Sequence, residues 1–189
     1  IQTVATPSIW GAGLALLVGG FLDPKAKVAY ATPSPEGPRI APQIEDLVRL
    51  HGDPVVARLL TSHGRPWTRE EMEKALAHWI ELFETRQLGK LRVRRKSDSL
   101  LVGRAGFGIY APTGEAEIGY SLYPEHWGNG YAFEAASALR DWYFRAKTED
   151  HFIGLADVRN DASKKVLDRI GMTRTHVGYA PVEQLCQFY

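Results

Sequence analysis

The feature that most constrains the fold is a glycine-containing loop between a strand-like and a helix-like segment. The loop, residues 127–132, has the sequence WGNGYA. In residues 117–123 before it, apolar side chains alternate as they do on a strand with one buried face. After it, apolar residues recur at helical spacing as far as Tyr143, and residues 152–158 again have β character. This order predicts two parallel strands joined by a right-handed crossover helix.

The two glycines of the loop, Gly128 and Gly130, favour the binding of an anionic ligand. Glycine tolerates positive φ and lets backbone N–H groups approach a ligand closely. The helix that begins near Ala132 directs the positive end of its dipole at the same place, which suits a pyrophosphate. The alternative is an ordinary strand-to-helix turn. A Rossmann dinucleotide site fits poorly because Phe133 would occupy the place of its third glycine, and the Gly-Lys-Ser/Thr of a P-loop is absent.

Helical patterns dominate the region before residue 89. Thr68 and Glu71 have the spacing of a capping box, and the apolar residues that follow predict a long helix that Gly89 ends. Before it, two shorter helices are expected on either side of the break at Asp53-Pro54.

Strand patterns surround the crossover helix. Residues 91–95 and 100–110 predict a hairpin with a polar turn between them. After the second parallel strand, Asn160 predicts the start of a helix that Gly171 ends. Residues 172–189 are expected to supply two closing strands, one of which contains Cys186 as a buried structural thiol.

Composition is that of a globular protein without a global electrostatic field. The 189 residues are 44% hydrophobic and 24% charged, and 23 basic against 22 acidic side chains give a net charge of +1. We therefore expect one domain over residues 1–189, with no nucleic-acid and no membrane partner. A single cysteine excludes an internal disulfide and favours a cytoplasmic location. The six histidines lack metal-ligand spacing, so no metal is expected.

The N-terminal segment, residues 1–39, is atypical. Residues 9–22 are apolar but shorter than the roughly 20 residues that span a bilayer. Two interpretations remain open: a buried strand or hairpin, and a secretory signal with residues 29–31 as a small-residue cleavage site.

Two longer motifs carry a family resemblance. EIGYSLYPEHWGNGYAFEA, followed by VRNDASKKVLDRIGM, resembles the GNAT acetyltransferase superfamily, and more closely its Rim-type branch of ribosomal-protein N-terminal acetyltransferases. The resemblance extends from about Ile40 to the C-terminus. It implies an α/β (α+β) fold: a mixed, twisted sheet with helices on both faces, splayed around a cofactor cleft. The usual opening strand of the family is not recognisable in residues 1–39.

The resemblance also assigns a cofactor site. It implies acetyl-CoA as cosubstrate, with its pantetheine arm added to the exposed edge of residues 117–123 like an extra strand. A backbone N–H near Leu122 would act as an oxyanion hole. Asn160 would cap its helix and hydrogen-bond the pantetheine or a water, a cap alone being the alternative. The residues implied in cofactor binding are Leu122, Trp127, Gly128, Asn129, Gly130, Tyr131, Ala132, Asn160 and Ser163.

For catalysis, the resemblance points to Glu117 as general base and Ser163 as a hydrogen-bond donor near the coenzyme sulfur. The base would remove the proton of an ammonium before direct attack on the thioester. The alternative is that Glu117 faces solvent and pairs with Arg104 on a neighbouring strand. Leu167 stands where many family members have a tyrosine acid, and the resemblance to the Rim-type branch implies Ser163 as the donor, with solvent as the alternative source of the final proton. Lys164 and Lys165 are candidates for the coenzyme phosphates, or form a solvated helix face.

The acceptor is expected to be a primary amine, either a protein N-terminus or a small molecule, and a homodimer is left open. Two other classes of function are weighed against this one. A non-catalytic acyl-CoA-binding or sensing module would bind coenzyme without turnover. A structural interaction protein would not bind coenzyme at all, and the intact glycine loop argues against it.

Overall fold

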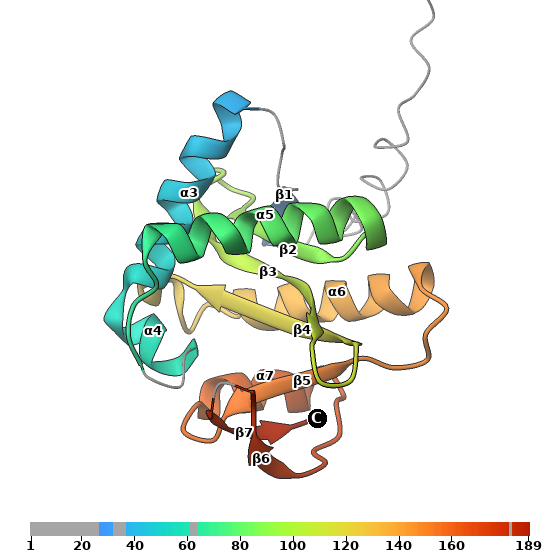
Figure 1. Ribbon diagram of the computed structural model, residues 1–189. Coiled ribbons are helices and arrows are strands. Elements are labelled where there is room, and N and C mark those ends of the chain that lie inside the picture. Colours follow the sequence, from blue (N-terminus) through green and yellow to red (C-terminus); the bar gives the residue numbers. More distant parts are fainter. Residues whose placement is uncertain (1–26, 32–36, 61–63, 182) are drawn as a thin grey trace, which may run out of the picture.

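The computed structural model describes residues 27–31, 37–60, 64–181 and 183–189. The expectations for residues 9–22 lie outside these residues. A seven-stranded sheet of order β1-β2-β3-β4-β5-β7-β6 runs through the described part of the chain (Figure 1). Its strands are β1 (Val28–Ala31), β2 (Gly89–Arg95), β3 (Leu101–Tyr110), β4 (Glu115–Leu122), β5 (Ile153–Asp157), β6 (Val177–Tyr179) and β7 (Leu185–Phe188).

The sheet is mixed, as predicted. Strands β4 and β5 are parallel, and every other neighbouring pair is antiparallel. The expected hairpin is β2 and β3, the crossover joins β4 to β5, and β6 and β7 are the expected closing strands. Strand β1 was not recognised from the sequence, yet it pairs with β2 and extends the sheet within residues 1–39.

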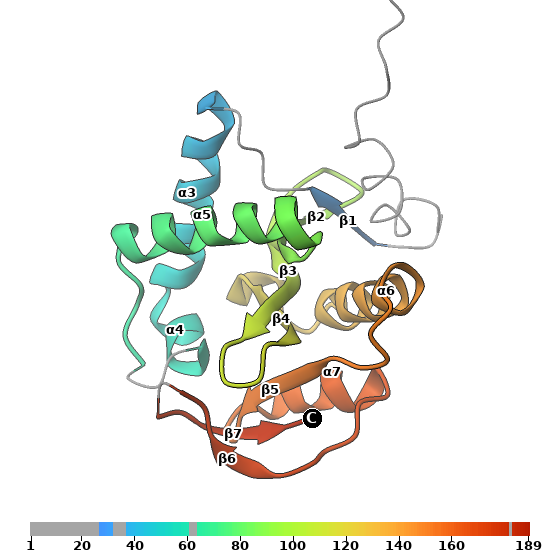
Figure 2. The same ribbon diagram turned by 45° about the vertical axis from the view of Figure 1, so that its right-hand side comes forward.

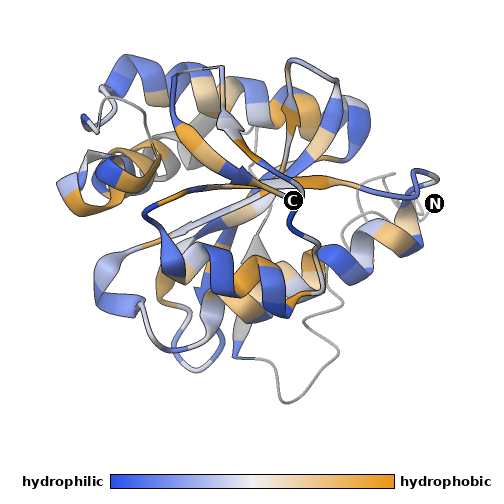
Figure 3. Cartoon of the chain, turned by 90° about the horizontal axis from the view of Figure 1, so that it is seen from below, coloured by the Kyte–Doolittle hydropathy of each residue, from blue (hydrophilic) through white to orange (hydrophobic). Residues whose placement is uncertain are grey.

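Helices cover both faces of the sheet (Figures 2 and 3). They are α3 (Gly37–Gly52), α4 (Pro54–Leu60), α5 (Arg69–Arg86), α6 (Tyr131–Ala146) and α7 (Asp161–Arg169), with a short 3-10 turn η1 (Pro124–His126). Helices α3 and α5 pack on each other through Leu47, Leu76 and Trp79 on one face of the sheet. Helices α6 and α7 share a core with the other face. The prediction that helices cover both faces of the sheet is therefore confirmed.

The ends of α5 confirm one local prediction and correct another. The Thr68 hydroxyl accepts the N–H of Glu71, and the Glu71 carboxylate accepts the N–H of Thr68, so the capping box is complete. Gly89 does not end the helix, because Gln87 takes the left-handed conformation there with φ 54°. Gly89 instead begins β2, where a Cβ atom would lie 2.6 Å from the Trp79 carbonyl oxygen.

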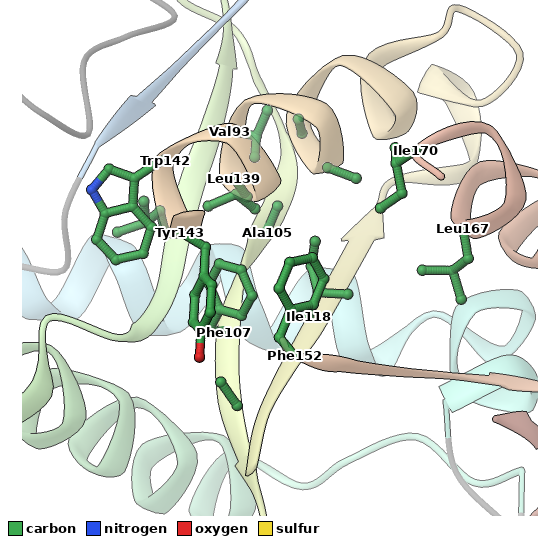
Figure 4. Packing of buried hydrophobic residues seen from close by; sticks show 14 of the residues in the cluster. Val93, Ala105, Phe107, Ile118, Leu139, Trp142, Tyr143, Phe152, Leu167 and Ile170 are labelled. Carbon is green, nitrogen blue, oxygen red and sulfur yellow. The ribbon is translucent and has the colours of Figure 1, made fainter. Parts of the chain in front are cut away.

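The main core lies between the sheet and α6 (Figure 4). Phe107 of β3, Tyr143 of α6 and Phe152 form an aromatic cluster with ring centroids 4.8 to 5.2 Å apart. Such offset and edge-on contacts add to the apolar area that each ring buries. This packing holds α6 against β3 and β4, and it fixes the direction from which the helix N-terminus meets the end of β4.

Candidate active site

The site begins where β4 and β5 separate. The two strands pair through only two positions, Glu117 with Ile153 and Ile118 with Gly154. Strand β4 then continues to Leu122, while β5 pairs onward with β7 on its other side. The predicted splay of the parallel strands is thus present, and no strand of the described residues pairs with the edge of β4 beyond Ile118.

A cleft of about 760 Å³ opens at this separation. It is lined by β4, β5, the start of α6, the start of α7 and parts of α4 and α5. The candidate site residues that line it are Glu117, Leu122, Trp127, Gly128, Gly130, Tyr131, Ala132, Asn160 and Ser163. Of the predicted set only Asn129 is not among the lining residues.

The glycine loop has the conformation that its sequence predicts. Gly128 and Gly130 have φ of 76° and 82°, and a Cβ at either position would meet no atom within 4 Å. The glycines are therefore required by the backbone turn, and the space above them is open. Gly130 is the N-cap of α6 and no side chain of the described residues caps this helix, so its first N–H groups are available to a ligand.

Two side chains of the loop fasten it to the preceding turn. The Trp127 indole Nε1 donates to the Leu122 carbonyl at 2.9 Å. The Asn129 amide donates to the carbonyls of His126 and Trp127 at 3.1 and 3.0 Å. Asn129 thus holds the loop in shape.

The backbone of Leu122 faces the opening. The N–H of the next residue, Tyr123, donates to the Val102 carbonyl on the β3 side at 3.1 Å. Because successive N–H groups of an extended chain point to opposite edges, the Leu122 N–H is directed away from β3. The Leu122 carbonyl, which accepts from Trp127 of the loop, has the same direction.

The start of α7 brings three polar side chains together. The Asn160 Oδ1 accepts the Ser163 N–H at 3.0 Å, so the predicted cap is present. The Ser163 Oγ lies 3.0 Å from the Tyr120 hydroxyl, which also donates to the Ser163 carbonyl at 3.1 Å. Burial raises the pKa of Tyr120 far above its ordinary value, and the Ser163 hydrogen bond opposes this only in part. Tyr120 therefore stays protonated at neutral pH.

Tyr120 is a polar group of the site that was not predicted from the sequence. Tyr120 lies on the same face of β4 as Ile118 and Leu122, where the alternation in residues 117–123 predicts an apolar side chain. The available signal was its hydroxyl, which a buried tyrosine must pair. Leu167 is almost fully buried against β5, so no hydroxyl comes from that position.

Glu117 stands half-buried on the cleft wall without a close partner. Within the described residues, its carboxylate has no ion pair or hydrogen bond, so the pairing with Arg104 that was weighed from the sequence is not formed. Arg104 instead donates its Nε to His51 Nε2 at 2.7 Å. Asp157, the other carboxylate of the cleft, is occupied by Arg159 and Gln184.

Lys90 is a second residue that the sequence did not single out. It lines the cleft and donates to the Gly106 carbonyl at 3.1 Å. Burial, followed by the charge of Arg104, lowers the pKa of Lys90 to about 7, although Glu117 opposes the shift. Burial also lowers the pKa of Arg104 to about 10.

The remaining candidate residues differ in whether their side chains line the cleft. Lys165 and Arg169 of α7 line the cleft, and Arg169 lies 4.0 Å over the ring of Phe133 in the first turn of α6. Lys164 does not line it, since its ammonium contacts the Val158 carbonyl and Asp161. Cys186 is buried, as predicted, and burial raises the pKa of its thiol to about 11.

Comparison with known proteins identifies the family. A model of the acetyltransferase (GNAT) domain matches residues 39–173, which is more than half of the chain. The chain therefore belongs to the GNAT acetyltransferase family. Within the described residues, no helix is both long and apolar enough to cross a membrane.

Individual relatives agree with this fold. The uncharacterized N-acetyltransferase YoaA of Bacillus subtilis is 29% identical over 112 residues, or 57% of this chain. The chain spans 33% and 63% of the length of two curated relatives that it matches. An acetyltransferase from Agrobacterium tumefaciens superposes with a TM-score of 0.70 at 23% identity, covering 86% of this chain and 90% of that one. RimL, a ribosomal L7/L12 α-N-protein acetyltransferase in complex with coenzyme A, gives 0.67 at 20% identity, covering 86% and 92%.

Proposed function

We propose that the chain is an acetyl-CoA-dependent N-acetyltransferase that transfers an acetyl group to a primary amine by direct attack. The observation that carries the proposal is that one cleft contains both the edge of β4 that no described strand pairs with and the uncapped N-terminus of α6 with its two open glycines. An extended ligand with a pyrophosphate at one end matches both halves of this site. Membership of the GNAT family and the coenzyme in RimL support the same assignment.

The residues present fit the coenzyme. Gly128, Gly130 and the N–H groups at the start of α6 would hold its pyrophosphate. Lys165 and Arg169 flank this end of the cleft and offer positive charge to its phosphates. The β4 edge near Leu122 would pair with the amide groups of its pantetheine arm, as an added strand does. When bound, the coenzyme supplies an acetyl thioester.

Three groups of the chain would then take part in the chemistry. The Leu122 N–H faces the opening and would hydrogen-bond the oxygen that becomes negative as the amine attacks. Glu117 would accept a proton from the ammonium form of the acceptor, since it has no competing partner among the described residues. Ser163 would donate a hydrogen bond to the leaving sulfur, with the protonated Tyr120 hydroxyl behind it.

Direct attack by the amine is favoured over covalent catalysis. Cys186 also lines the cleft, but its thiol has a raised pKa and carries little thiolate at neutral pH. The Rim-type branch would give a protein N-terminus or a small-molecule amine as acceptor. With one cysteine and no disulfide, we propose a cytoplasmic site of action.

The test is thermal stability with and without acetyl-CoA, followed by thiol release against amines and N-terminal peptides. A ligand at 100 times its dissociation constant adds about 2.7 kcal/mol to the stability of the folded state. We expect stabilisation and thiol release together. Stabilisation without release from any amine favours the sensing module, and no stabilisation refutes the assignment of the glycine loop.

A further inference from the structure

Two basic side chains lie on the sheet face covered by α5, at the wall of the same cleft. The register of β2, β3 and β4 places Lys90, Gly106 and Gly119 side by side on this face. A Cβ on Gly119 would lie 2.7 Å from the Lys90 ammonium nitrogen, so that nitrogen lies directly over bare backbone. Gly119 follows Ile118, the last residue of β4 that pairs with β5. Lys90 therefore reaches the point where the two strands separate.

Arg104 of β3 is the second basic group, and it is held rigidly. Its side chain is 8% exposed, its Nε donates to His51, and its guanidinium carbon lies 4.7 Å over the Trp79 ring. Burial, with the charge of Arg104, lowers the pKa of His51 to about 2, so His51 is a neutral acceptor. Within the described residues, Nη1 and Nη2 of Arg104 have neither a hydrogen-bond acceptor nor an ion pair.

The acidic side chains at this wall carry too little negative charge to neutralise its basic side chains. In the part of the chain that the structure describes, Glu117 and Asp157 are the acidic residues that line the cleft, and Arg159 already pairs with Asp157. Among the described residues, Glu117 is therefore the one unpaired carboxylate near Lys90 and Arg104, and it forms no ion pair with either. Buried charges without a partner are strongly unfavourable, and an arginine with two free donors presents a fork that matches the oxygens of an oxyanion.

We propose that Arg104 and Lys90 bind an oxyanion of the acceptor, so that the acceptor is a zwitterion whose amine is joined by a short chain to a carboxylate or a phosphate. This inference rests on the proposed acetyl transfer and narrows its acceptor. The Glu117 carboxylate, on the same face of β4 two residues before Gly119, faces the ammonium end while the basic pair holds the oxyanion. A polyamine would instead bring its own positive charges against Arg104 and Lys90, with the single carboxylate of Glu117 to attract them.

The first experiment compares acceptors that differ only in the acidic group. Thiol release is measured for leucine against 3-methylbutylamine, for phosphoethanolamine against ethanolamine, and for spermidine. We expect kcat/KM for one zwitterion to exceed that of its parent amine by about tenfold or more, as for a charge-assisted hydrogen-bond pair. The two pairs distinguish a carboxylate from a phosphate. Equal or faster release with the parent amines or spermidine overturns the inference while leaving acetyl transfer intact.

A pair of matched variants tests whether Arg104 binds the oxyanion. Arg104→Lys removes the fork and keeps the charge, and Arg92→Lys is its control, because Arg92 is the cross-strand neighbour of Arg104 but pairs with Asp46. Arg104→Lys should raise KM for the zwitterion about tenfold, whereas Arg92→Lys should not. The stabilisation by coenzyme A, measured in each variant, reports whether the cofactor half is intact. Equal effects of the two variants contradict the role of Arg104.

A binding measurement gives a readout without turnover. Titration of the zwitterion into the protein saturated with coenzyme A at pH 8 should take up a proton, because an anion beside Lys90 favours its charged form. Lys90→Met should abolish this uptake, which is obtained by comparing buffers of different ionisation enthalpy. Binding without proton uptake in the unchanged protein overturns the role of Lys90. Absence of thiol release with every amine refutes the proposed function and this inference with it.

Discussion

Replacing the loop glycines with alanine separates backbone strain from ligand binding. Gly128 and Gly130 have φ of 76° and 82°, and Gly114, in the turn between β3 and β4, has φ of 77° with equally open surroundings. An alanine in this conformation costs about 1 to 2 kcal/mol. For a chain of this length each kcal/mol lowers the melting temperature by about 2 to 4 °C. All three variants should therefore lose a similar amount of stability without ligand.

Acetyl-CoA should distinguish them. At Gly128 or Gly130 the added methyl group enters the space that we assign to the pyrophosphate, and a tenfold loss of affinity corresponds to about 1.4 kcal/mol. At a fixed, near-saturating concentration of acetyl-CoA, this reduces the ligand-induced rise in melting temperature by about 3 to 6 °C. Gly114→Ala should keep the full rise. Equal rises in all three variants, measured by differential scanning fluorimetry, would refute the placement of the pyrophosphate.

Three further predictions concern individual side chains. Glu117→Gln should lower kcat by about 100-fold or more, with unchanged stabilisation by acetyl-CoA, if Glu117 is the general base; thiol release near the original rate argues against that role. Tyr120→Phe should lower the free energy of unfolding by about 1 kcal/mol, because the hydroxyl loses its bonds to Ser163, and urea unfolding that shows no change contradicts this. Lys90 has a folded-state pKa of about 7, below that of the unfolded chain, so the unfolded state binds more protons between about pH 7 and 10. Stability should rise with pH over this window by up to about 1.4 kcal/mol per unit relative to Lys90→Met, and parallel profiles of the two proteins are the contrary result.

The parts of the fold that sequence analysis predicted depend on contacts between near neighbours. The capping box of Thr68 and Glu71, the cap at Asn160 and the two positive-φ glycines are decided within a few residues of chain. The hairpin and the crossover follow from periodicity and short turns. Strand β1 was not predicted from the sequence because its pairing with β2 joins segments more than 60 residues apart. Its own sequence, VAYA, has no strong alternation.

The basic wall of the cleft depends on distant contacts and was missed. The Lys90 side chain lies against two glycines on two other strands, Gly106 and Gly119. A shift of the strand register by one residue would move this side chain to the opposite face of the sheet. Arg104 depends on His51 and Trp79, which come from helices that precede it in the chain. The alternative that Glu117 pairs with Arg104 could be weighed from cross-strand spacing alone, but the contact between Arg104 Nε and His51 could not, because His51 lies 53 residues earlier in the chain.

The short pairing of β4 with β5 also has a consequence for the protein before any ligand arrives. An unpaired strand edge normally occurs at the rim of a sheet, where charged side chains, prolines or a covering loop discourage other chains from adding to it. Here the open edge lies in the interior of the strand order, between two halves that are each hydrogen-bonded. A second protein strand could therefore reach the open edge only by entering the cleft between those halves. A thin, flexible chain with amide groups needs less room at such an edge than a pleated strand, which carries side chains on both faces.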